Sequence, residues 1–205
     1  FLFLLGVFDV FMSEGLLCMK CGAVRWLTVA TILVIGACTS PEKHPNVILD
    51  GDDFFGRPWP DDTRTNGGNP DKDGFPQRGE LDLIDTYMEA IEALDGFGTN
   101  SPIYVPLEYR PDPLPPSSAT TTTDGPLWLI DVDPQSEERG RLVPIALAYQ
   151  DEETLWQRSD LMSVQPVWGF PLRPRTTYAL VLTTEFVATA EDWRLSGNWE
   201  DLDAV

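Results

Sequence analysis

The sequence predicts a mainly β fold, an antiparallel sandwich that follows a turn-rich segment and one amphipathic helix. After Gly98, five short runs are rich in β-branched and aromatic residues, and turns rich in Pro, Gly or Thr separate them. These runs do not alternate with helical patterns, so we expect two packed antiparallel sheets rather than a doubly wound parallel sheet. The predicted strands are residues 101–109, 126–132, 142–149, 161–168 and 176–184.

One helix is predicted over residues 80–94. Its apolar side chains recur at the spacing of one helix face, and acidic side chains occupy other positions. The apolar stripe consists of Leu81, Ile84, Met88, Ile91 and Leu94. The preceding segment is dense in Gly, Pro, Asn and Asp, which predicts consecutive turns. We expect four of its aromatic residues to pin it to the core, namely Phe54, Phe55, Trp59 and Phe75.

Composition divides the chain into five parts. Residues 110–125 are expected to form a long exposed loop within the sandwich. Because five strands are fewer than the about seven of a complete sandwich, we expect a further domain after residue 205. The parts are 1–37, upstream residues plus a signal peptide; 38–53, a polar tether; 54–98, the turn-rich segment with the helix; 99–186, the sandwich; and 187–205, the start of a further element.

A bacterial secretion signal is predicted from Met19. Lys20 and Arg25 supply its positive start, and residues 26–37 form an uncharged, mostly apolar stretch that is too short to span a bilayer. Residues 1–18 are interpreted as upstream sequence that takes no part in the fold.

Cys38 directly follows two small residues, Gly36 and Ala37, at the end of this stretch. The run from Ile35 to Cys38 resembles the lipobox of bacterial lipoproteins. The resemblance implies that the Cys38 thiol receives a diacylglyceryl group and that this lipid holds the mature chain at a membrane. Thr39 stands where an Asp would retain such a lipoprotein at the inner membrane, which favours the outer membrane. The alternative is an ordinary secretory leader with an incidental cysteine.

Charge and cysteine usage argue against several classes of function. A formal net charge of −19 argues against nucleic-acid binding, because an acidic surface repels phosphates. The chain after Cys38 has no cysteine, so neither a disulfide framework nor a Cys-based zinc site is expected. The only histidine, His44, lies in the tether without a rigid partner, and no G-x-S-x-G motif occurs. No catalytic residue is therefore assigned, and an enzyme is not favoured.

The sharpest local pattern runs from Asn69 to Glu80. It matches the template of a calcium loop, in which oxygen ligands alternate, Gly74 permits the sharp turn and the last ligand begins a helix. The alternative is a solvated turn whose aspartates accept hydrogen bonds from their own backbone. The candidate calcium ligands are the side chains of Asn69, Asp71, Asp73 and Glu80 and the carbonyl of Phe75.

Acidic pairs and tryptophans offer two further patterns. Asp131 and Asp133 are interpreted as a strand end running into a turn rather than as a glycosidase acid and base. Exposed tryptophans would form a platform for carbohydrate stacking. Trp128 and Trp168 lie in strand-like runs and are predicted to be in the core, whereas Trp156 has a polar context that favours exposure.

Two stretches resemble known families. The run from Gly169 to Thr183, with two prolines before an alternating strand, is similar to a hairpin of bacterial Ig-like domains, which implies an Ig-like β-sandwich. Residues 93–103, preceded by residues 59–62, resemble the N-terminal regions of bacterial lipoproteins, lipases and virulence-associated proteins. In those proteins any α/β-hydrolase domain lies downstream.

Together these patterns predict a lipid-anchored cell-envelope lipoprotein with a non-catalytic Ig-like module. The module would act as a spacer or bind a protein or carbohydrate ligand. The alternative is the N-terminal accessory domain of an anchored esterase or lipase whose catalytic domain lies beyond residue 205. A third reading is a calcium-regulated adhesin.

Overall fold

The structure is a computed structural model of the chain. It describes the backbone of residues 3–6, and residues 44–66, 69–91, 94 and 96–188. The predicted signal peptide, the lipidation site at Cys38 and the element expected from residue 189 onward lie outside the described residues.

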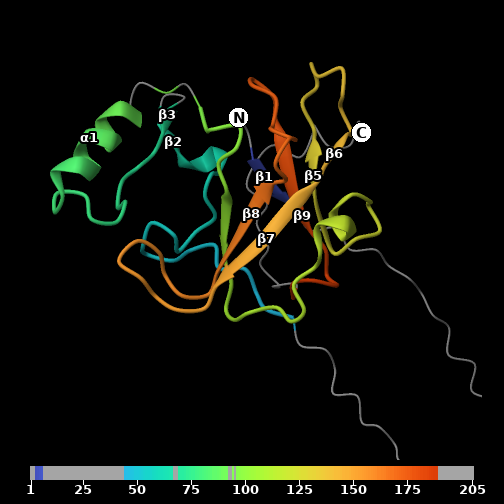
Figure 1. Ribbon diagram of the computed structural model, residues 1–205, viewed down its shortest axis with the longest axis horizontal. Coiled ribbons are helices and arrows are strands. Elements are labelled where there is room, and N and C mark those ends of the chain that lie inside the picture. The colour runs from blue at the N-terminus through green and yellow to red at the C-terminus, as the bar shows by residue number, and fades with distance from the viewer. Residues whose placement is uncertain (1–2, 7–43, 67–68, 92–93, 95, 189–205) are drawn as a thin grey trace, which may run out of the picture.

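Two β-sheets form the body of the protein, which confirms the prediction of a mainly β fold (Figure 1). Their strand orders are β1-β9-β5-β6 and β4-β8-β7. Neighbouring strands are antiparallel except β1 and β9. The first sheet contains β1 (Phe3–Gly6), β9 (Tyr178–Leu182), β5 (Leu127–Asp131) and β6 (Leu142–Val143), and the second contains β4 (Ile103–Pro106), β8 (Leu161–Pro166) and β7 (Ile145–Gln150). A small hairpin joins β2 (Thr65–Asn66) and β3 (Asn69–Pro70).

The two sheets share one hydrophobic core. In the first sheet, Leu129 of β5 lies opposite Leu180 of β9, and both are fully buried. In the second sheet, Val105 of β4 lies opposite Met162 of β8, and both are again fully buried. Burial of each such side chain stabilises the fold by about 1.5–3 kcal/mol. Alternation along the strands thus directs one face of each sheet inward.

The predicted strand 142–149 is in fact two strands, one in each sheet. β6 pairs with β5, whereas β7 pairs with β8. Pro144 stands between them, and because proline has no N–H to donate, it interrupts the ladder where the chain passes from one sheet to the other. Its carbonyl accepts a hydrogen bond from the Val167 N–H at 2.9 Å, which ties this corner to the end of β8.

The segment 110–125, predicted to be an exposed loop, contains a buried anchor. Its 3-10 helix η2 (Ser117–Thr120) places the Thr120 side chain in the interior. The Thr120 hydroxyl donates to the Ser117 carbonyl at 2.8 Å and accepts from the Ile145 N–H at 3.1 Å. The loop therefore supplies the acceptor for the first N–H of β7.

The predicted tether, residues 38–53, joins the fold earlier than expected. Val47 is buried, forms an antiparallel bridge with Leu107 and belongs to the main core. The neighbouring Ile48 N–H donates to the Pro106 carbonyl at 2.9 Å. The predicted boundary is wrong because the short apolar run that starts at Val47 lies inside a stretch that is polar on average.

Four aromatic residues pin the turn-rich segment to the second sheet, as predicted. The Phe54 ring centroid lies 4.9 Å from that of Phe55, 4.8 Å from that of Trp59 and 5.1 Å from that of Phe75. Phe55 in turn packs edge to face on Tyr104 of β4, at 5.0 Å.

Arg64, at the end of the 3-10 helix η1 (Asp62–Arg64), lies within this aromatic cluster. Its guanidinium carbon is 4.3 Å from the Phe54 ring centroid and 4.7 Å from that of Trp59. Burial, assisted by the nearby charge of Arg57, lowers the pKa of Arg64 to about 10. Contact with the two ring faces offsets part of the cost of burying this charge.

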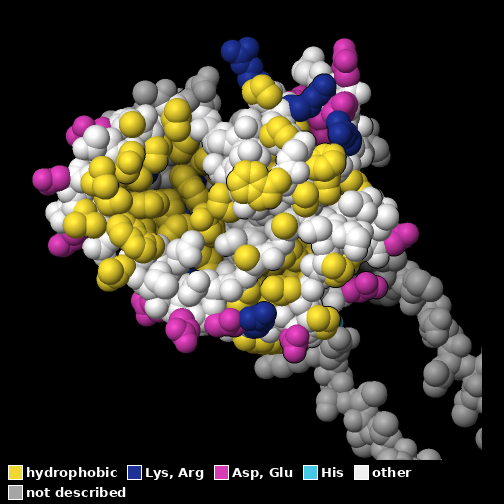
Figure 2. Space-filling model, in the orientation of Figure 1, with side chains coloured by type: hydrophobic (Ala, Val, Ile, Leu, Met, Phe, Trp, Pro, Cys, Tyr) yellow, Lys and Arg dark blue, Asp and Glu magenta, His cyan; other side chains and the backbone are white. Residues whose placement is uncertain are grey.

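Helix α1 spans Asp82–Ile91, within the predicted range. Of the predicted apolar stripe, Met88 is buried but Leu81 and Leu94 are exposed. The buried Lys72 ammonium donates to the Met88 carbonyl at 3.0 Å and ties the helix to the turn-rich segment. Figure 2 shows hydrophobic side chains gathered on the side of the molecule where α1 lies. Within the described part of the chain, no helix has the length and apolarity needed to cross a bilayer.

β1 differs from the expectation that residues 1–18 take no part in the fold. It pairs in parallel with β9, with Phe3 opposite Tyr178 and Gly6 opposite Val181. β9 is buried along its whole length. A strand edge presents unpaired N–H and C=O groups, and a short apolar strand satisfies them. The apolar start of the chain has the composition for this role.

Candidate functional site

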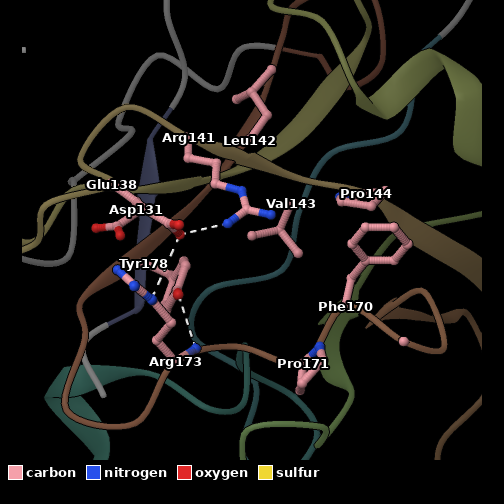
Figure 3. Close-up of a pocket in the computed structure, with 11 residues that line it drawn as sticks. Asp131, Glu138, Arg141, Leu142, Val143, Pro144, Phe170, Pro171, Arg173 and Tyr178 are labelled. Atoms are coloured by element: carbon pink, nitrogen blue, oxygen red, sulfur yellow. Dashed lines mark hydrogen bonds and ion pairs between the residues drawn. The ribbon is translucent and has the colours of Figure 1, made fainter.

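A pocket of about 220 Å³ opens where β5 ends and β9 begins (Figure 3). Asp131 is the last residue of β5, Tyr178 is the first of β9, and the two lie opposite each other in the sheet. Both line the pocket. The remaining walls come from the loop between β5 and β6, the corner at Pro144 and the loop that precedes β9.

Tyr178 fixes the loop that precedes β9. Its hydroxyl accepts a hydrogen bond from the Arg173 N–H at 3.0 Å, and its side chain is only 2% exposed. Burial raises the pKa of Tyr178, and the hydrogen bond from the Arg173 backbone opposes this effect. Pro171 and Pro174 flank Arg173 and restrict the backbone further. The backbone at Arg173 is therefore held in place at the edge of the pocket.

Two aspartates shape the loop between β5 and β6. The Asp131 carboxylate accepts from the Asp133 N–H at 3.0 Å and from the Ser136 hydroxyl at 2.6 Å. The Asp133 carboxylate accepts from the Gln135 N–H at 2.8 Å and from the Thr177 N–H at 3.2 Å. This confirms the prediction that the pair forms a strand end and turns. Both carboxylates serve as structural acceptors.

Glu138 joins the two guanidinium groups of the pocket. Its Oε2 lies 2.5 Å from Arg141 Nη1 and 3.6 Å from Arg173 Nε. The Arg141 side chain is 55% exposed and that of Arg173 is 46% exposed, so water screens both ion pairs. A guanidinium has five N–H donors. Because Glu138 engages one nitrogen of each arginine, further donors of both groups remain available at the pocket.

An aromatic wall faces these charged groups. Phe170 lines the pocket and is 47% exposed, and Trp168, two residues earlier, is 87% exposed. The turn that carries them is fixed, because the Phe170 N–H donates to the Val167 carbonyl at 2.9 Å. Gly169 has a φ of 94°, a conformation that favours glycine. Figure 3 shows Phe170 across the pocket from the two arginines, with Val143 between them.

The prediction that Trp168 belongs to the core is wrong. β8 ends at Pro166, which cannot donate to a ladder, and the tryptophan follows in an exposed turn. Trp128 is half-buried on β5, and Trp156 is exposed, as its polar context indicated.

Apart from Asp131, the charged residues of the pocket were not singled out from the sequence. Arg141, Arg173 and Glu138 lie in two separate loops, and only the pairing of β5 with β9 brings these loops together. One signal was present, because Arg173 and Arg175 form a basic segment in an acidic chain, and Glu137 and Glu138 lie next to Arg139 and Arg141 in a second charged segment. Figure 2 shows several Lys and Arg side chains at the top of the view, with Asp or Glu side chains among them, and another at the bottom.

The candidate calcium loop has other contacts. Asp71 accepts a hydrogen bond from the Asp73 N–H at 3.0 Å, and Asp73 forms an ion pair with Arg78 at 3.2 Å. Phe75 packs its ring in the aromatic cluster. Glu80 is exposed, and its N–H donates to the carbonyl of a preceding turn residue at 3.2 Å.

Part of the template is nevertheless present. Asn69 begins β3, and Gly74 has a φ of 79°, as a sharp turn requires. Among the described residues, no three His, Cys, Asp or Glu side chains form a group that could hold a metal ion. These contacts favour the solvated-turn alternative, and calcium binding stays a prediction of the sequence.

Comparison of the chain with models of protein families, with curated proteins and with solved structures finds no match.

Proposed function

We propose that the chain is a lipid-anchored cell-envelope lipoprotein whose folded part is a non-catalytic Ig-like module. Cys38 carries the lipid, and the outer membrane is the location that Thr39 favours. The module acts as a spacer and binds a ligand at the pocket between β5 and β9.

The observation that carries the Ig-like part of the proposal is the hydrogen bond between Tyr178 and Arg173. In Ig-like sandwiches a tyrosine near the start of one strand bonds back to the backbone a few residues upstream, the tyrosine corner. Tyr178 begins β9 and bonds to the backbone five residues before it. The two sheets around one core support the same proposal.

The non-catalytic role is supported by the way the polar groups are used. Glu138 is engaged by two guanidinium groups, and Asp131 holds the shape of its loop. Catalysis by a serine, threonine or cysteine nucleophile needs that hydroxyl or thiol beside a base. Within the described part of the chain, the residues that line this pocket include no Ser, Thr or Cys. The neighbouring hollow has Ser136 and Thr176, but the Ser136 hydroxyl donates to Asp131 and the Thr176 hydroxyl donates to the Pro174 carbonyl.

Cell fractionation tests the lipid anchor. We expect the wild-type chain, expressed in a bacterium with the lipoprotein pathway, to sediment with membranes until detergent is added. The Cys38→Ser variant should be released as a water-soluble protein. Equal membrane retention of both proteins would overturn the anchor.

A second candidate is the accessory domain of an anchored hydrolase, and one contact favours it. Trp59 and Phe97 come from the two segments on which the resemblance to lipase N-terminal regions rests, and their rings pack edge to face with centroids 5.1 Å apart. The reading frame beyond residue 205 discriminates the two candidates. A downstream G-x-S-x-G motif followed by Asp and His favours the hydrolase, whereas tandem sandwich repeats favour the module.

A further inference from the structure

We propose that the pocket between the Arg141–Glu138–Arg173 group and Phe170 binds one unit of a neutral carbohydrate, and that Trp168 supports the next unit. This inference rests on the proposed binding function and names its ligand class.

The balance of charge in the pocket favours a neutral ligand. Two guanidinium groups, from Arg141 and Arg173, face two carboxylates, from Asp131 and Glu138. An anion would meet both carboxylates and the field of a chain with a net charge of −19, and a cation would meet both arginines. A polyhydroxylated ligand, with donors and acceptors on adjacent atoms, suits both kinds of group.

The exposed aromatic side chains favour a ligand with an apolar face. A tryptophan that is 87% exposed leaves a large apolar surface in water, and Phe170 beside it is also exposed. A pyranose ring presents C–H groups on one face and hydroxyl groups at its rim. Stacking of that face on Phe170 would direct the rim hydroxyls towards Arg141 and Glu138 on the opposite wall.

The site is held in shape without a ligand. Tyr178 fixes the backbone at Arg173, the turn hydrogen bond from Phe170 to Val167 fixes the backbone of the aromatic wall, and Asp131 fixes the loop that carries Glu138. A preorganised site loses little conformational entropy when its ligand binds.

The size of the pocket limits what fits inside. Its volume of about 220 Å³ is below the roughly 300–1,000 Å³ of sites for drug-sized ligands. One sugar ring is of suitable size, and a longer chain must continue over the surface. Trp168 belongs to the same exposed turn as Phe170, and we assign it to the next unit.

Titration calorimetry with the full-length chain carrying Cys38→Ser tests the proposal. The neutral probes are maltohexaose, cellohexaose and chitotetraose, and oligogalacturonate is the acidic probe. We expect saturable binding of at least one neutral probe and weaker or no binding of the acidic one. Phe170→Ala and Trp168→Ala should each raise the Kd about tenfold, the worth of one aromatic contact.

Trp156→Ala is the matched control, because Trp156 is also an exposed tryptophan but lies in the loop between β7 and β8. Its Kd should equal that of the parent. Since Trp168 and Phe170 are exposed, the variants should keep the parent's melting temperature.

Three results would overturn the inference: no neutral probe binds, binding survives both aromatic substitutions, or the acidic probe binds more tightly. Fractionation of the Cys38→Ser variant judges the anchor separately. If the Cys38→Ser variant leaves the membrane fraction as expected but no sugar binds, the ligand class is rejected and the proposed function stands.

Discussion

The Tyr178 hydroxyl accepts a hydrogen bond from the Arg173 N–H, at 3.0 Å. This contact joins the first core residue of β9 to the loop that lines the pocket. The fold and the candidate site therefore depend on the same hydrogen bond.

Removal of that hydroxyl should destabilise the protein. Tyr178→Phe leaves the Arg173 N–H without its acceptor, and we expect a loss of about 1 kcal/mol in the free energy of unfolding. Urea denaturation measures the loss. The control is Tyr87→Phe on α1, where the tyrosine is exposed and the change should stay within about 0.5 kcal/mol. Equal denaturation midpoints for both variants would contradict the role assigned to Tyr178.

Stability should decline at alkaline pH. Burial raises the pKa of Tyr178, and burial together with the hydrogen bond donated to Asp160 raises the pKa of Tyr149. In the unfolded chain these groups ionise near their usual pKa of about 10. The two neutral tyrosines therefore contribute their full stabilisation below about pH 10. This stabilisation is lost as the pH rises through their pKa values in the folded protein.

The measurement is the free energy of unfolding between about pH 8 and 12. Tyr149→Phe should flatten the alkaline decline, because it removes one group whose pKa differs between the folded and unfolded states. An unchanged slope in the variant would reject this cause.

The buried hydroxyl of Thr120 should be needed at the sheet corner. Thr120→Val leaves the Ile145 N–H without an acceptor in the interior, which should cost about 1–3 kcal/mol. Thr121→Val is the matched control, since Thr121 is the next residue but is exposed. Thermal or urea unfolding compares the two variants. A similar loss in both would show that the effect is not specific to the buried bond.

Calcium should leave the loop from Asn69 to Glu80 unchanged, because Asp71 accepts from the Asp73 N–H and Asp73 pairs with Arg78. Phe75 touches Phe54, which touches Trp59, so rearrangement of the loop would alter tryptophan fluorescence. We expect no change up to millimolar calcium. A saturable change that Asp73→Asn abolishes would instead establish the calcium site.

The sequence predicted where most strands lie but did not predict where a strand is interrupted. β5 and β9 were predicted because their β-branched and aromatic runs carry enough local signal. The division at Pro144 was missed because the apolar run continues across the proline. The residues after Pro144 form β7, and they pair with β8 of the second sheet, which the local sequence does not indicate. Val47 was assigned to the tether because its pairing with Leu107 is distant in sequence.

The pocket could not be predicted from local sequence patterns, because it too depends on contacts between residues that are distant in sequence. Arg141 and Arg173 belong to different loops, and nothing in either segment alone indicates that Glu138 contacts both. Trp168 was placed in the core by its strand-like neighbours, although Pro166 ends the strand before it. The calcium template matched the type and spacing of residues, but it carried no information on partners such as Arg78.

The proposed anchor has a consequence for the fold. Cleavage before Cys38 would remove β1 together with the signal peptide, and the outer edge of β9 would then be open to another strand. Retention of β1 in the mature protein would instead mean that Cys38 is not the N-terminus.

Mass spectrometry of the protein purified from bacterial membranes decides between these states. Digestion with trypsin should yield an N-terminal peptide, residues 38–43, whose Cys38 carries a diacylglyceryl group and an N-acyl chain. Peptides from residues 1–37 should be missing. Recovery of an unmodified Cys38 within a longer peptide, together with peptides from the start of the chain, would contradict the lipid anchor.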